Sequence, residues 1–325
     1  MIDLIIDTDT GSDDAVALML ALGNPEVNVK AITTVAGNVP VDFGSKNALA
    51  TVALMGKNTP VYQGFDRPLM RDLHTAQNVH GADGMSGAPI PTNIPKLSGF
   101  DAVNKLIELP KAEPGKYTLV TLGPLTNIAA ALFQDPNVLS YYKEVYCMAG
   151  SPEGWGNVTP SAEFNIWCDP ESFKVVLRSG TPIVMVGWNI SREYAVIAKP
   201  ETDNFKKIGT ARANYLLDIN IQVAKFCKEV TGIDGFDLPD PITMAIALNP
   251  NLIIKSELVR MDVACDEFMR GTLIIDRSVA AQKLGPNVKV IWEADREGFL
   301  NSLYEMCQDG SNPTGFTPRP LDFYL

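Results

Sequence analysis

Short apolar runs rich in β-branched residues alternate with helical hydrophobic patterns along the first part of this 325-residue chain. The apolar runs lie at 4–6, 29–35, 117–122, 145–148 and 183–186, and the helical patterns lie at 15–22, 41–55, 125–132 and 172–177. Strands that alternate with helices tend to pair in parallel, because each helix carries the chain back across the sheet. The sequence therefore predicts an α/β fold with a mainly parallel sheet flanked by helices.

The part of the chain after Pro200 has a different order of elements. It shows helical patterns at 202–208, 211–230 and 240–248, β-like runs at 252–261, 271–275 and 288–292, and a terminal helix at 296–306. No internal repeat or low-complexity linker separates the two parts. We therefore expect a single domain over residues 1–325, with a mixed, mainly parallel, Rossmann-related sheet and a ligand site beyond the carboxyl ends of its strands.

Charge narrows the set of possible partners, and cysteine usage indicates the cellular compartment. The chain has 38 acidic and 27 basic residues, a formal net charge of −11, and no basic cluster longer than Lys206-Lys207. We therefore expect neither nucleic acid nor a membrane as a partner. The five cysteines are widely spaced, which is typical of buried thiols in the cytoplasm. The absence of a secretion signal pattern and of a long apolar run agrees with that compartment.

Four carboxylates lie between the first apolar run and the first helical pattern: Asp7, Asp9, Asp13 and Asp14. Acids this close repel one another unless a cation shares them, and a hard divalent metal such as Ca²⁺ or Mg²⁺ suits an all-oxygen set. A helix cap would explain only one or two of them. The pattern predicts that all four converge on one metal, in a site unlike the EF-hand loop, because Gly11 occupies the place of a ligand.

Further polar residues follow other predicted strands. Glu163 and Asn165 alternate, so an extended segment would point both side chains the same way, and an acid beside an amide suits sugar hydroxyls. Capping of the next helix explains the pair equally well. The segment Leu122-Gly123-Pro124 exposes backbone groups where a strand ends, and Asp240 stands between two prolines where a helix begins. Each of these signals is weak by itself.

Taken together, these segments resemble the calcium-dependent nucleoside hydrolases of the inosine-uridine-preferring type, which split the N-glycosidic bond of ribonucleosides. The resemblance runs in order from Asp7 to Pro241. It is carried by DTDTGSDDAVAL (7–18), TTVAGN (33–38), NVHGADG (78–84), LGPLTN (122–127) and AEFN (162–165). The first of these motifs is highly specific.

The resemblance implies a function for each matching position. It implies Ca²⁺ held by Asp9, Asp14, Asp240 and the main-chain carbonyl of Leu122, with a water molecule and the ribose 2′- and 3′-hydroxyls completing the shell. Asp9 would take a proton from that water. The implied sugar contacts are Asp13 and Asn165 to the diol, Asn157 and Glu163 to the 5′-hydroxyl, and Asn38 and Met148 along the pocket. The family likeness also suggests a homodimer or homotetramer.

The chain departs from the family pattern at the leaving-group acid. Many relatives have a histidine immediately before the acid that matches Asp240, but this chain has Pro239 there, and its only histidines are His74 and His80. His80 matches a family position near the base pocket, so it is a candidate catalytic donor or a stacking surface. Two other sets of candidates stay open: ring stacking by Trp155, Trp188, Phe226 or Phe236, and proton transfer from Lys228, Glu229, Asp234 or Asp237.

Two alternative functions compete with nucleoside hydrolysis. Asp7-Thr8-Asp9 after a strand also resembles the nucleophile loop of haloacid dehalogenase-type phosphatases, but no convincing downstream acidic pair follows and the extra Asp13-Asp14 has no role there. The second alternative is a ribose- or nucleoside-binding protein that has lost turnover together with the histidine. The intact Asp9 argues against that loss.

Overall fold

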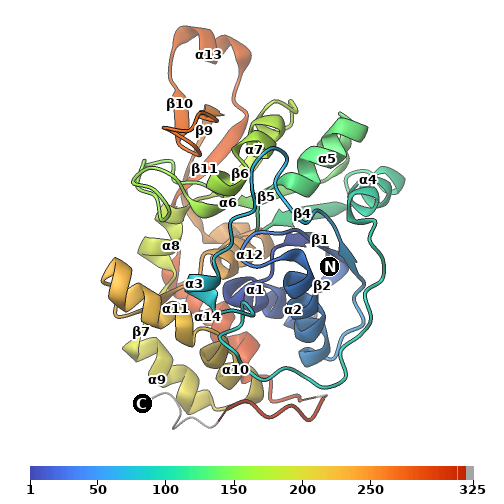
Figure 1. Cartoon of the computed structure of the whole chain (residues 1–325), viewed down its shortest axis with the longest axis vertical. Coiled ribbons are helices and arrows are strands. Elements are labelled where there is room, and N and C mark those ends of the chain that lie inside the picture. Colours follow the sequence, from blue (N-terminus) through green and yellow to red (C-terminus); the bar gives the residue numbers. More distant parts are fainter. Residues whose placement is uncertain (313, 320–325) are drawn as a thin grey trace.

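The computed structural model describes residues 1–312 and 314–319. A nine-stranded sheet forms its centre (Figure 1). In spatial order the strands are β10 (Leu273–Asp276), β9 (Ile253–Val263), β11 (Val288–Ala294), β6 (Ile183–Val186), β5 (Glu144–Met148), β4 (Tyr117–Thr121), β1 (Ile2–Thr8), β2 (Val27–Thr34) and β3 (Val61–Gln63). All neighbours from β3 to β11 pair in parallel, whereas β9 pairs antiparallel with both β11 and β10. The predicted mixed, mainly parallel sheet is confirmed.

The strand order reverses at β1, because β2 follows on one side and β4 lies on the other. At such a switch point the loops after the two central strands diverge and leave a crevice beyond the carboxyl ends of the strands. The loops that follow β1, β2, β4 and β5 therefore define where a ligand can bind.

Alternation along β1 divides the core between the two faces of the sheet. Leu4 and Ile6 pack into one buried cluster and Ile5 into the other, as the two-residue period of a strand requires. The first cluster is covered by α1 (Ser12–Gly23), α2 (Val41–Leu54), α10 (Ala211–Ile219), α12 (Pro239–Leu248) and α14 (Arg296–Gln308). The second is covered by α4 (Ala102–Ala112), α5 (Thr126–Gln134) and α7 (Pro170–Leu177).

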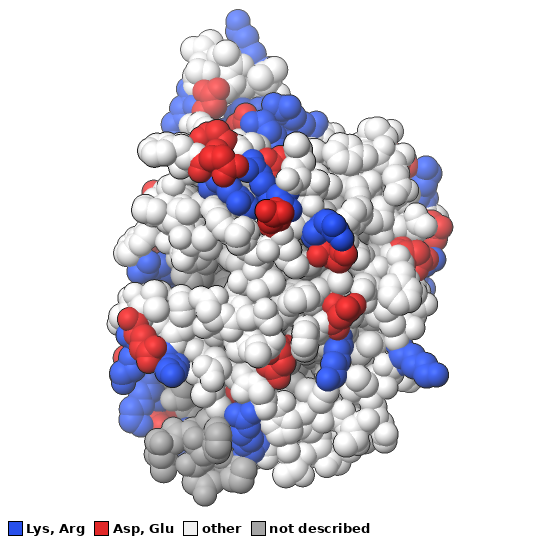
Figure 2. Space-filling view, in the orientation of Figure 1, with Lys and Arg blue, Asp and Glu red and all other residues white. Residues whose placement is uncertain are grey.

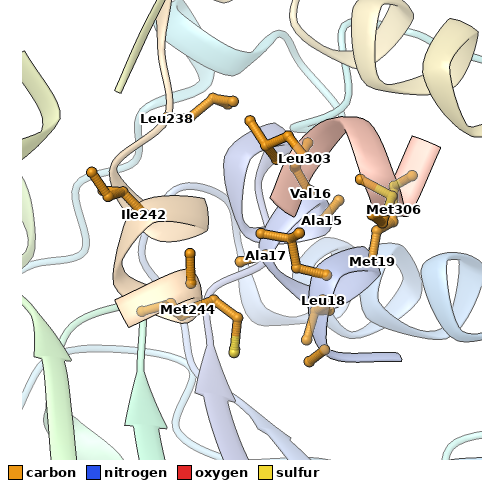
Figure 3. Packing of buried hydrophobic residues seen from close by; sticks show 14 of the residues in the cluster. Ala15, Val16, Ala17, Leu18, Met19, Leu238, Ile242, Met244, Leu303 and Met306 are labelled. Carbon is orange, nitrogen blue, oxygen red and sulfur yellow. The ribbon is translucent and has the colours of Figure 1, made fainter. Parts of the chain in front are cut away.

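Helix α1 is the centre of the first cluster and fixes the start of the site. Its alanine, leucine and methionine residues favour a helix, and Asp14 accepts a hydrogen bond from the Gly11 N–H at 2.8 Å, which caps its first turn. Every residue from Ser12 to Leu22 is buried. Figure 3 shows α1 packed against Ile242 and Met244 of α12 and Leu303 and Met306 of α14. The acids at the start of α1 are therefore held by a rigid core.

Shorter elements complete the chain. They are α3 (Gln77–His80), α6 (Phe164–Cys168), α8 (Trp188–Tyr194), α9 (Lys199–Ile208), α11 (Ile221–Phe226), α13 (Val279–Leu284), the 3₁₀ helices η1 (Val138–Tyr141) and η3 (Pro250–Leu252), the π-helix η2 (Cys227–Thr231), and a two-stranded antiparallel sheet of β7 (Val196–Ala198) and β8 (Gly235–Asp237). The edge built from β9, β10 and α13 extends from one end of the molecule (Figure 1).

The prediction of one helix over 211–230 is wrong. Asn220 leaves helical geometry between α10 and α11, its side-chain Nδ2 donates to the Leu216 carbonyl at 2.8 Å, and η2 follows α11 directly. Around Glu163 and Asn165 the capping alternative is confirmed, since Glu163 caps α6 and Asn165 lies inside it. The five cysteines are free thiols, as predicted. No helix in the described ranges is long and apolar enough to cross a membrane.

Candidate active site

Asp9 lies in the loop directly after β1, fully buried between two other loops. Its Oδ2 accepts a hydrogen bond from the Asn38 N–H at 2.6 Å, and its Oδ1 has no partner among the residues that the structure describes. Gly37 and Gly123 approach it so closely that a Cβ would stand 2.1 Å from Oδ2 at the first position and 2.7 Å from Oδ1 at the second. The glycines of two sequence motifs thus make room for this carboxylate.

Three further carboxylates form a cluster beside Asp9. Asp13, Asp14 and Asp240 each offer an oxygen, and these oxygens lie within 4.8 Å of one another. The two oxygens of Asp14 accept hydrogen bonds from Thr8 Oγ1 at 2.5 Å and from Asn38 Nδ2 at 3.0 Å, in addition to the Gly11 amide. The start of α1 and the start of α12 bring these acids together.

Burial dominates the electrostatics of the cluster. It raises the pKa of Asp9, Asp13 and Asp240 well above the ordinary value, and the charge of Asp14 raises each further. None of the described residues that line the adjoining pocket is a lysine or arginine. Desolvated carboxylates that repel one another gain most from a shared cation.

The donor set fits a hard divalent cation. All of the side-chain donors are oxygens, and Oδ1 of Asp9 and Oδ1 of Asp13 are buried without a hydrogen-bond partner in the described part of the chain. The Leu122 carbonyl, at the end of β4, accepts one hydrogen bond from Asn165 Nδ2 at 2.7 Å. A carbonyl oxygen has two lone pairs, so the second can serve a cation.

Asp7 does not join this cluster, contrary to the sequence prediction. Its Oδ1 accepts hydrogen bonds from Thr33 Oγ1 at 2.5 Å and Asn127 Nδ2 at 2.8 Å. Asp7 is the last but one residue of β1, and the alternation of the strand puts it on the same face as Ile5, which packs into the second buried cluster, whereas α1 packs into the first. Burial raises the pKa of Asp7 to about 7. Its contacts tie β1 to β2 and α5, so it stabilises the structure around the loop rather than contacting a ligand.

One pocket collects most of the residues that the sequence singled out. Its lining includes Asp13, Asn38, His80, Leu122, Met148, Asn157, Glu163, Asn165 and Asp240. At one end, Glu163 accepts hydrogen bonds from the Gly150 and Asn165 amides, both at 2.7 Å, and Asn157 Oδ1 accepts one from the Phe164 amide at 2.9 Å. Both side chains therefore cap α6 and also border the pocket.

The other end of the pocket is largely apolar. It is formed by Val79 and His80 of α3, Trp188 of α8, and Val223, Phe226, Cys227, Val230 and Thr231 of α11 and η2. His80 Nδ1 lies 2.9 Å from Ser12 Oγ and 3.7 Å from Asp13 Oδ1. Burial lowers the pKa of His80 to about 4, so its imidazole is neutral at pH 7.

The open candidates at this end fall into two groups. Trp188 and Phe226 line the pocket, whereas Trp155 is 59% exposed beneath the guanidinium of Arg192 and Phe236 is packed in the core. Among the ionisable candidates, Asp237 lines the pocket, and Lys228, Glu229 and Asp234 are exposed to solvent.

Sequence reasoning missed part of the pocket. Cys227, Thr231 and Val223 form its wall, but they carry no motif, and the helix pattern over 211–230 gave no sign of the break that turns them inward. The contacts of Ser12 with His80 and of Thr8 with Asp14 were not predicted either. Ser12 and Thr8 both belong to the first motif, so the presence of Ser and Thr there was the sequence feature that could have indicated these contacts.

The switch-point fold and the acidic pocket define the class as an α/β protein with a ligand pocket beyond the carboxyl ends of its parallel strands. The family model "inosine-uridine preferring nucleoside hydrolase" matches residues 4–301. The chain belongs to the inosine-uridine preferring nucleoside hydrolase family, whose members are ribonucleoside hydrolases. The match over nearly the whole chain replaces the phosphatase hypothesis.

Relatives and solved structures with different base preferences resemble this chain. It is 41% identical over 307 residues to an uncharacterised protein of Schizosaccharomyces pombe, covering 93% of this chain and 97% of that one. It is 35% identical to a pyrimidine-specific ribonucleoside hydrolase of Escherichia coli O7:K1, covering 93% and 97%. The purine-preferring ribonucleoside hydrolase from Gardnerella vaginalis superposes with a TM-score of 0.87 at 28% identity, covering 94% and 99%.

Proposed function

We propose that this protein hydrolyses the N-glycosidic bond of ribonucleosides and releases ribose and the free base, with Ca²⁺ as its cofactor. One observation carries the proposal: buried carboxylates, two of which have an oxygen with no hydrogen-bond partner among the described residues, cluster at a pocket that polar and apolar side chains line together. A nucleoside likewise combines a polar and an apolar part, since its sugar is rich in hydroxyls and its base is a flat ring.

The cation would be held by Asp9, Asp14, Asp240 and the Leu122 carbonyl, with Asp13 close by. When bound, such an ion neutralises the repulsion between these carboxylates and lowers the pKa of a water molecule. Asp9 Oδ1, which has no partner in the described ranges, is free to accept the proton of the attacking water. The Asn38 amide holds the other oxygen of Asp9 and so fixes the direction of the base.

The sugar end would hold ribose by its hydroxyls. Asp13 and Asn165 receive the 2′,3′-diol, Glu163 and Asn157 receive the 5′-hydroxyl, and Asn38 and Met148 complete the wall. Breaking the C1′–N bond leaves positive charge on the sugar, which resembles an oxocarbenium ion in the transition state. The anionic side chains around the ring stabilise that charge more than they stabilise the neutral substrate.

The base end would receive the ring between Trp188, Phe226 and His80. An aromatic and apolar wall stabilises any nucleobase by stacking and by excluding water, so these contacts alone do not select purine or pyrimidine. In this proposal the neutral His80 contacts the base and orients it through its hydrogen bond with Ser12.

The proposal is tested by ribose release from inosine, adenosine, guanosine, uridine, cytidine and nicotinamide riboside, measured with calcium and again with a chelator. We expect turnover that disappears with the chelator and returns with calcium. Turnover confined to purines would indicate activation by ring stacking, whereas turnover of uridine would indicate a proton donor at the base end. Binding of nucleosides without cleavage would favour the binding-protein hypothesis instead.

We also propose a cytoplasmic homodimer or homotetramer. The free thiols support a reducing compartment, and the family resemblance supports self-association. Light scattering coupled to gel filtration tests the second statement, which a monomeric mass at micromolar concentration would contradict.

A further inference from the structure

The wall formed by α11, η2 and β8 contains a buried carboxyl group that the proposed mechanism does not use. Asp237 is the last residue of β8, is 4% exposed, and borders the apolar end of the pocket. The neighbouring candidates cannot reach a buried base: Lys228 and Asp234 pair with each other at 3.6 Å on the surface, with side chains 74% and 87% exposed. Glu229 is also exposed.

The contacts of Asp237 fix its position and leave one oxygen weakly engaged. Ser191 Oγ donates to Oδ2 at 2.7 Å, whereas among the described side chains Oδ1 accepts only from the Cys227 thiol, at 3.6 Å. A thiol is a weak hydrogen-bond donor, so Oδ1 is the oxygen that can carry a proton toward the pocket. Pairing of β8 with β7 places Asp237 opposite Val196, and the Leu238 amide donates to the Ala195 carbonyl at 3.1 Å.

The surroundings of Asp237 favour its neutral form. Trp188, Val223 and Phe226 line the pocket beside it, and burial raises its pKa. The charged and titratable groups that act on it are few: the Cys227 thiol, whose own pKa burial raises to about 12, the Asp13 carboxyl, and Arg192, which lowers the pKa of Asp237 but is stacked on Trp155. A carboxylic acid whose neutral form is favoured by an apolar pocket can act as a general acid.

We propose that Asp237 is the catalytic acid that protonates the departing base, in place of the histidine that many relatives have at the position of Pro239. The proposal rests on the nucleoside hydrolase activity proposed above. As the C1′–N bond breaks, its electron pair stays on the base nitrogen, which takes the proton of Asp237. The water oxygen bonds to C1′ and its proton passes to Asp9. After the products depart, Asp237 regains a proton from solvent and Asp9 gives its proton up to solvent.

The test compares leaving groups that need a proton with one that does not. Uridine and inosine need protonation, whereas 4-nitrophenyl riboside releases a stable phenolate. We expect Asp237→Asn to lower kcat on both nucleosides by about 10²–10³-fold, the usual contribution of a general acid, and to lower kcat on the aryl riboside by at most about tenfold. The alkaline limb of the kcat/KM profile on nucleosides should also disappear. Asp234→Asn, on the exposed side of the same segment, is the matched control and should leave both substrates unaffected.

The outcomes separate this inference from the proposed function. Equal losses on both substrate types, or no loss on either, overturn the role of Asp237 while wild-type turnover leaves the hydrolase proposal intact. If wild type cleaves no nucleoside, the proposed function itself fails. If Asp237→Asn does not fold, Ser191→Ala decides: losing a donor to the carboxylate raises the pKa of Asp237, so the alkaline limb should move to higher pH, and an unmoved limb overturns the inference.

Discussion

The close approach of Gly37 to Asp9 provides a sharp test of how the base is positioned. A methyl group at residue 37 would stand 2.1 Å from Asp9 Oδ2 and 2.8 Å from Pro124 Cδ, where ordinary contacts begin at 3.4 Å. Gly37 is not in the left-handed region of backbone space, so only the lack of room opposes alanine. Gly37→Ala must therefore push the carboxylate of Asp9 aside by about 1.3 Å.

The displacement has a cost in stability and a cost in rate. It breaks the 2.6 Å bond from the Asn38 amide to Asp9, and a buried polar group left unpaired costs about 1–3 kcal/mol of the free energy of unfolding. A shift of about 1 Å in a catalytic group costs about 10²-fold in rate. We therefore expect kcat/KM for the substrate that wild type prefers to fall about 10²-fold.

The assay is ribose release under saturating calcium, with denaturant unfolding in parallel. Gly310→Ala is the control, because nothing lies within 4 Å of the Cβ it would add. Because Gly37→Ala acts through Asp9, it should lower kcat/KM little further in a protein that already carries Asp9→Asn. A double-mutant cycle measures this coupling. Retention of a third or more of wild-type activity by Gly37→Ala would refute the reasoning, as would full additivity with the Asp9 variant.

Three other predictions follow from the site and its supports. Asp240→Asn removes a charged oxygen from the cluster, so the calcium concentration that restores half of the activity after chelation should rise at least about tenfold; an unchanged titration would contradict this. Burial lowers the pKa of His80 from 6.5 to about 4, so between these pH values the native state binds fewer protons than the unfolded state. The stability that the neutral imidazole contributes is therefore lost as the pH falls from 6.5 to about 4. The NMR signals of His80 should stay constant from about pH 8 to 5, and titration near 6.5 would show that the site is not desolvated. Arg319→Ala removes the guanidinium that lies 3.3 Å from the fully buried Asp218 and should lower the free energy of unfolding by about 3 kcal/mol, so an unmoved urea midpoint would disprove the importance of this pair.

The order of elements and the main acids were predictable because their signals are local. Strand, acidic turn and helix are contiguous from Asp7 to Leu22, so the position of Asp9 and Asp14 beyond the carboxyl end of β1 follows from alternation alone. Asp240 was placed with them by the family resemblance, whereas the prolines beside it indicate only the start of its helix. Strand ends and helix starts are the features that short-range periodicity and capping encode.

The features that the sequence could not predict depend on contacts between residues far apart in the chain. Asp7 turns to Asn127, which is 120 positions away, and no local pattern separates it from Asp9. Glu163 and Asn165 reach the pocket from a helix start, and the sequence could not choose between that and an extended segment. The wall formed by α11 and η2 depends on the break at Asn220. The pairing of β7 with β8 joins segments about 40 residues apart with no motif in either.

Ribose release from uridine and inosine by wild type and Asp9→Asn, together with nucleoside binding measured by calorimetry in calcium, tests the central claim most directly. The account predicts that wild type cleaves at least one of the two nucleosides, and that the variant binds the same nucleoside but cleaves it at least about 10²-fold more slowly. Equal turnover by the two proteins, or binding by both without cleavage by either, would contradict the assignment of this pocket as a hydrolytic site with Asp9 as its base.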